Sequence, residues 1–129
     1  MSMNSGGLRS PLGKVRLLGS AHNGAGEAWL MHVTSLALIP LSLYFVSLML
    51  RLLHTDYNGA RATLGRPIPA ILILAFVLTG IVHMELGMRS VIVDYIHGRG
   101  RGWALLANTC VSALLALACV YATLRVSFT

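Results

Sequence analysis

Three long apolar segments dominate the chain, and its polar residues are concentrated at the ends and in two short connections. The segments run from about 29 to 53, from 67 to 95 and from 103 to 126. Each reaches the roughly 20 residues that a helix needs to cross the hydrocarbon core of a bilayer. In lipid, a helix satisfies its backbone polar groups within the segment itself. The pattern therefore predicts an all-α integral membrane protein whose three transmembrane helices form a bundle.

The polar residues define the expected organisation around these helices. Residues 1–28 are polar and Gly/Ser-rich and lack the apolar core of a secretory signal peptide. We expect a surface segment over 1–28 and a three-helix membrane anchor domain over 29–129. Pro67 suits the first turn of the second helix. The basic, Gly-rich stretch 98–102 is expected to connect the second helix tightly to the third.

Composition and charge support this class and exclude others. The chain is 56% hydrophobic and 11% charged, too few charges for the surface of a small water-soluble domain. Its net charge of +6 does not indicate nucleic-acid binding, because the basic residues flank the apolar segments instead of forming one patch. The balance of basic residues between the two sides favours a cytoplasmic N-terminus: Arg9, Lys14, Arg16, Arg99 and Arg101 against Arg51, Arg61, Arg66 and Arg125.

The second helix carries the candidate chemistry. Ionisable side chains inside a membrane span are costly and indicate functional sites. Four occur here: His83, Glu85, Arg89 and Asp94. Glu85 precedes Arg89 by four residues, the favourable order for an ion pair, so we predict a structural role for both. Contact of Arg89 with a haem propionate or with another subunit is the alternative.

Glycines surround the intramembrane histidine. Gly80 and Gly87 fall on the same side of the helix as His83, which predicts a flat clearing where a planar group can reach the imidazole. That arrangement suits an axial haem ligand. The alternative is a histidine that bonds to a neighbouring helix, with glycines that allow close packing. Asp94 shares the stripe of His83, rotated by about 20° and displaced by about 16 Å.

A second histidine ligand is not expected from this chain. His32 is placed at the very start of the first helix, whereas His83 lies about 18 Å from the Tyr95 end of the second. In antiparallel neighbours these positions differ in depth, so the two rings cannot bind one iron. If the sixth ligand is histidine, a haem here would be shared with another subunit.

The spacing from His83 through Gly87-Met88 to Asp94-Tyr95, on the second of three membrane helices, resembles the hydrophobic membrane anchor subunits of succinate dehydrogenase, the smaller of the two membrane chains of that enzyme. The segments Pro11 to Arg16, Val33-Thr34 and Pro40-Leu41 resemble the alphaproteobacterial type.

This resemblance implies specific residue roles. His83 would be one axial ligand of haem b, and a partner cytochrome b subunit would supply the other. Tyr95 would donate a hydrogen bond to a ubiquinone carbonyl, with Asp94 supporting the site or proton delivery. The family usually has an arginine near the haem propionates where this chain has His32. We therefore expect His32 only as an alternative propionate or quinone-site contact.

The resemblance also implies the setting. The chain would anchor respiratory complex II, which links succinate oxidation in the tricarboxylic acid cycle to electron transport, and would have no activity alone. Its partners would be the cytochrome b, iron–sulfur and flavoprotein subunits and the lipid bilayer. The bacterial cytoplasmic (inner) membrane is favoured over the mitochondrial inner membrane. Two alternatives remain: the anchor of a fumarate reductase, and a small structural or transport membrane protein without haem.

Overall fold

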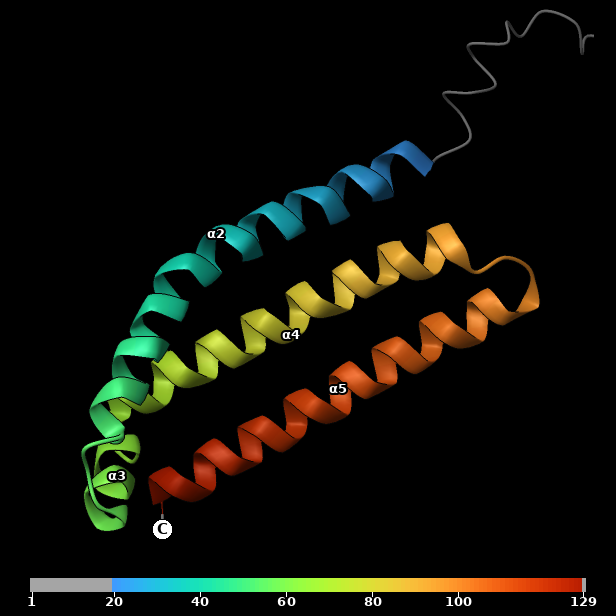
Figure 1. Ribbon diagram of the computed structural model, residues 1–129. Coiled ribbons are helices and arrows are strands. Elements are labelled where there is room, and N and C mark those ends of the chain that lie inside the picture. The colour runs from blue at the N-terminus through green and yellow to red at the C-terminus, as the bar shows by residue number, and fades with distance from the viewer. Residues whose placement is uncertain (1–19, 129) are drawn as a thin grey trace, which may run out of the picture. The chain divides into compact units, whose positions relative to one another are not determined.

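The computed structural model describes residues 20–128, with side chains from residue 24 onward. This part of the chain is helical throughout, apart from short connections (Figure 1). Its elements are α2 (Ser20–Leu52), α3 (Tyr57–Leu64), α4 (Pro67–Tyr95) and α5 (Arg99–Phe128). Three of these helices are long and apolar enough to cross a membrane, over Gly24–Leu52, Pro67–Tyr95 and Arg99–Phe128. The prediction of an all-α membrane protein with three spans is confirmed.

The central span, α4, has the bounds that the sequence predicted. Pro67 stands in its first turn, where the missing N–H costs no helical hydrogen bond, and Arg66 is the extended N-cap. The helix ends at Tyr95, and the extended Ile96 still donates its N–H to Ile92 O at 2.9 Å. Gly98 follows with a φ of 77°, a left-handed conformation that glycine adopts without steric cost. Because α5 begins at Arg99, the connection is shorter than the expected stretch 98–102.

The first span begins earlier than expected. Helix α2 starts at Ser20 instead of near residue 29, so part of the expected surface segment is helical; residues 1–19 of that segment lie outside the described residues. Hydropathy locates the part of a helix that suits lipid, and a helix can continue beyond it through polar residues. Packing divides the chain between Leu30 and Met31. All contacts discussed below lie within the unit that begins at Met31.

A short helix, α3, lies between the first two spans, where the apolar pattern indicated only a short polar connection. Asp56 caps it, because its Oδ1 accepts a hydrogen bond from the Gly59 N–H at 3.2 Å. At the other end, the Gly65 N–H donates to Arg61 O at 2.9 Å. α3 contacts both α4 and α5.

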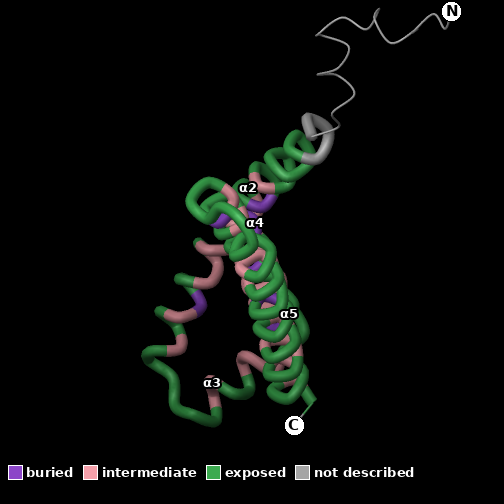
Figure 2. Tube along the Cα trace, turned by 90° about the vertical axis from the view of Figure 1, so that its right-hand side faces the viewer, coloured by how far each residue is buried: buried purple, intermediate pink, exposed green. Residues whose placement is uncertain are grey.

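The long helices bury little of themselves. Helices α4 and α5 lie side by side and antiparallel (Figure 1), and α2 meets α4 where Phe45 stacks on Phe76 with ring centroids 4.7 Å apart. In the most apolar 18-residue stretch of each long helix, few residues are buried: 11% in α2, 11% in α4 and 6% in α5. Figure 2 shows exposed positions along most of each helix. Since the exposed side chains are mainly apolar, these faces suit lipid or other membrane subunits.

Candidate functional site

His83 lies within the α4 span, where its half-buried ring faces α2. Its Nδ1 is 3.0 Å from Oγ1 of Thr34. Thr34 is 7% exposed, and the same Oγ1 donates a hydrogen bond to Met31 O at 3.0 Å. The imidazole is thus held through one nitrogen, which leaves Nε2 on the other side of the ring. This contact combines features of both sequence hypotheses: the histidine bonds to a neighbouring helix, yet one ring nitrogen is left for a ligand.

The two glycines beside His83 have different surroundings. A Cβ built at Gly80 would lie 3.9 Å from Cδ2 of Leu38, an ordinary contact with α2. A Cβ at Gly87 would have no heavy atom of the described residues within 4 Å beyond its chain neighbours and the nearby helix backbone. The open space therefore lies on the Gly87 side of His83, while Leu38 borders the Gly80 side.

The prediction that His32 and His83 lie at different depths is wrong. It assumed a helix that begins near residue 29, but α2 begins at Ser20 and Thr34 already contacts His83. His32 is only about 3 Å along the helix axis from Thr34, so its depth is close to that of His83. The separation is one of direction, because two residues turn a helix by about 200° and place His32 on the face opposite Thr34. His32 is exposed there. Within this chain, the two histidines still do not converge.

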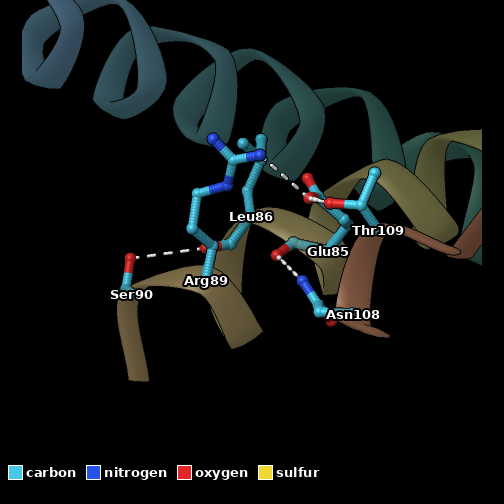
Figure 3. Close-up of polar contacts among 6 residues, drawn as sticks. All are labelled: Glu85, Leu86, Arg89, Ser90, Asn108 and Thr109. Carbon is cyan, nitrogen blue, oxygen red and sulfur yellow. Dashed lines mark hydrogen bonds and ion pairs between the residues drawn. The ribbon is translucent and has the colours of Figure 1, made fainter. Parts of the chain in front are cut away.

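Polar contacts connect α4 to α5 around Glu85 (Figure 3). The predicted ion pair is confirmed, with Arg89 Nη2 at 3.2 Å from Glu85 Oε1. Thr109 Oγ1 donates to the same carboxylate oxygen at 3.1 Å, and Asn108 Nδ2 donates to the Glu85 carbonyl at 3.1 Å. Sequence reasoning missed Asn108 and Thr109. Their signal was present as an adjacent polar pair within an apolar segment. The alternative role of Arg89 as a propionate contact stays a prediction.

Asp94 and Tyr95 form the last residues of α4. Both residues are exposed, and the exposed fraction of Tyr95 is 81%. Asp94 lies about 16 Å along α4 from His83, close to the same face. The structure thus places both residues, a carboxylate and a phenol, at the end of the span, before the turn at Gly98. Their roles at a quinone stay predictions.

The described side chains do not form a metal cage of their own. Within residues 24–128, no group of three or more His, Cys, Asp or Glu side chains comes together to hold a metal ion. A haem needs less from this chain, since the porphyrin supplies four nitrogens and one histidine can serve one axial position. A single held imidazole with open space at Gly87 fits that requirement.

A wide groove lies elsewhere in the described part of the chain. It has a volume of about 670 Å³ and is formed by α3 and the end of α5. Its lining consists of Tyr57, Ala60, Arg61, Leu64, Tyr121, Ala122, Arg125 and Val126. None of the predicted site residues borders it, so this groove does not belong to the predicted haem or quinone site.

Comparisons with known proteins agree with the residue pattern. Residues 7–118 match the succinate dehydrogenase/fumarate reductase transmembrane subunit family. The succinate dehydrogenase hydrophobic membrane anchor subunit of Paracoccus denitrificans is 35% identical over 108 residues, which cover 84% of each chain. The protein of the same name from Rickettsia bellii is 35% identical over 88 residues, 68% of this chain and 70% of that one. No solved structure matches significantly. Among known proteins, the chain is similar to hydrophobic membrane anchor subunits, and it belongs to the succinate dehydrogenase/fumarate reductase transmembrane subunit family.

Proposed function

We propose that this multi-pass membrane protein anchors a succinate dehydrogenase, supplies one axial ligand of a shared haem b, and forms part of the site where ubiquinone is reduced. The observation that carries the proposal is the held imidazole of His83, with Nδ1 bonded to Thr34 and open space at Gly87. Both relatives carry the name of a succinate dehydrogenase anchor, which supports the enzyme assignment.

The haem role depends on the different surroundings of the two ring nitrogens of His83. His83 would bind iron through Nε2, because Nδ1 is occupied by Thr34. Gly87 would let the porphyrin approach the helix backbone, since a larger side chain there would fill the open space. When bound, the haem would supply a one-electron redox centre within the membrane. Because His32 lies on the opposite face of α2 from Thr34, the second axial ligand would come from the cytochrome b subunit.

The quinone role rests on the exposed end of α4. The Tyr95 phenol would donate a hydrogen bond to a quinone carbonyl oxygen. The neighbouring Asp94 carboxylate would pass protons to the reduced quinone, which takes up two protons with two electrons. The exposure of Tyr95 supports this role, because the residues that the structure describes leave the phenol open to a ligand or another subunit.

The partners follow from the large apolar surface and from the names of the relatives. A cytochrome b membrane subunit would cover part of the exposed helix faces, and the iron–sulfur and flavoprotein subunits would bind at the membrane surface. Succinate would be oxidised on the flavoprotein, so this chain would have no activity alone. We place the complex in the bacterial cytoplasmic membrane with the N-terminus on the cytoplasmic side, where the basic residues are slightly more numerous.

The test is the visible spectrum of the detergent-purified complex carrying His83→Ala. We expect the b-type haem to be lost or its spectrum altered, while covalent or tightly bound flavin reports that the complex has assembled. His54→Ala is the matched control, because His54 is exposed in the turn after α2 and its Nδ1 lies 3.2 Å from Leu50 O, near the end of that helix. An unchanged haem spectrum and haem-to-flavin ratio in His83→Ala would defeat the ligand assignment.

A further inference from the structure

Thr34 is the residue through which α2 holds the His83 ring. Its Oγ1 lies 3.0 Å from Nδ1 of His83 and also 3.0 Å from Met31 O, one turn back along α2. Thr34 is 7% exposed, so water has little access to compete for this hydroxyl. The contact is therefore set by the two helices.

The arrangement of protons follows from what each group can donate. A hydroxyl has one hydrogen and two lone pairs, and a backbone carbonyl can only accept. If Thr34 donates its hydrogen to Met31, its oxygen can only accept from His83, which requires the proton on Nδ1. In the other tautomer, Nδ1 and the carbonyl would compete for one hydrogen, and one of the two contacts would bring lone pairs together. The Nδ1-protonated tautomer thus satisfies one hydrogen bond more.

We propose that Thr34 is a positioning residue that selects the Nδ1-protonated tautomer of His83 and fixes the direction of its ring, so that the unprotonated Nε2 is presented to iron. The inference rests on the proposed haem function and adds to it a residue on another helix. A histidine that binds a metal commonly donates its second N–H to a neighbouring acceptor, which orients the ring and makes it a stronger base. The chain from ring N–H to hydroxyl to carbonyl would reinforce this effect, since each bond polarises the next.

The proposal predicts a change in the haem itself. Thr34→Val keeps the branched shape and removes the hydroxyl. We expect haem affinity to fall by about 10-fold or more, as for other partners of metal ligands. In haem that remains, the midpoint potential should rise, because a less basic imidazole stabilises ferric iron less than before. Thr34→Ser keeps the hydroxyl, so the complex with this variant should have the native haem-to-flavin ratio and the native midpoint potential.

Ser35 offers a matched control on the same helix. Its Oγ donates to the same Met31 carbonyl at 2.8 Å, but the side chain is exposed and has no bond to His83. Ser35→Ala should leave the haem-to-flavin ratio, the potential and the electron paramagnetic resonance of the ferric haem unchanged. If the complex with Thr34→Val does not assemble, Thr34→Ala can be compared with Thr34→Ser, because these two variants differ only in the hydroxyl group.

The outcomes separate the two proposals. The positioning role is overturned if the variants without the Thr34 hydroxyl keep the native potential and resonance spectrum, or if Thr34→Ser changes them as much as Thr34→Val does. In either case, loss of the haem in His83→Ala would leave the ligand assignment standing. An unchanged haem in His83→Ala would instead remove the basis of both.

Discussion

Enlarging Gly87 would test directly what fills the space beside His83. Gly87 lies four residues after His83, about 6 Å further along α4 and about 40° around it. Among the described residues, a Cβ there would meet no heavy atom within 4 Å apart from its chain neighbours and the nearby helix backbone. Gly87→Leu should therefore be tolerated by the chain itself. In aqueous hosts, replacing a helix-interior glycine even stabilises the helix by about 0.5–1 kcal/mol.

The expected cost comes from outside the chain. If a porphyrin packs against the bare backbone at Gly87, the leucine side chain would overfill that contact, at about 1–3 kcal/mol. Because about 1.4 kcal/mol corresponds to a factor of ten, haem affinity should fall by roughly 5- to 150-fold. Gly87→Ala adds a single methyl group, so its loss of haem affinity should lie at the lower end of this range or below it.

The assay is the haem-to-flavin ratio of purified complex, titrated with added haem. Gly80→Ala is the matched control, because its new methyl would make an ordinary 3.9 Å contact with Leu38; it should keep the native ratio. Full haem content and an unchanged spectrum in Gly87→Leu would refute the placement of haem on this side of His83. Loss of the flavoprotein together with haem would also refute it, since the space would then belong to another subunit.

Three further predictions concern the quinone site and the helix contacts. Tyr95→Phe should slow ubiquinone reduction by up to about tenfold, the value of one hydrogen bond, while reduction of an artificial acceptor by succinate stays unchanged; equal losses would contradict the quinone role. Thr109→Val removes an interhelical bond to Glu85 and should cost about 0.6 kcal/mol, measured as a lower thermal midpoint of the detergent-purified complex. Ser47→Ala, which removes only a bond within α2, should not lower the midpoint as much, and a similar fall would refute the interhelical contribution. Phe45→Ala should lower the same midpoint further, because it removes the stacking on Phe76, worth about 0.5–1.5 kcal/mol beyond its buried area; an unchanged midpoint would show that the stack does not stabilise the complex.

The sequence predicted features that depend on residues close together in the chain. The predicted bounds of α4 were correct because Pro67 starts the helix and the turn at Gly98 follows its end. The Glu85–Arg89 pair was correct because its members are four residues apart on one helix. The start of α2 was missed, since hydropathy reports where lipid is tolerated and not where helical hydrogen bonding begins. α3 was missed although Asp56 carries an N-cap signal.

The contacts between helices required the structure. The bond from Thr34 to His83 depends on the register of α2 against α4, and the wrong start of α2 led to the wrong depth for His32. The donation from Thr109 to Glu85 likewise depends on how α5 pairs with α4. Neither register is fixed by the apolar pattern, because all three spans are apolar around most of their circumference.

The sparse burial along these spans has a consequence for biogenesis. Hydrocarbon surrounds an apolar helix as readily as another apolar helix does, so association in the bilayer depends on close packing and interhelical hydrogen bonds. Each span is long and apolar enough to cross a membrane. We therefore expect the bonds between the spans to form after insertion. A copy synthesised in excess of the other subunits would keep broad helix faces against lipid. Few contacts would then hold its three helices in one packing arrangement. We therefore expect cellular amounts of this chain to follow those of its neighbours, with surplus copies removed by membrane proteases.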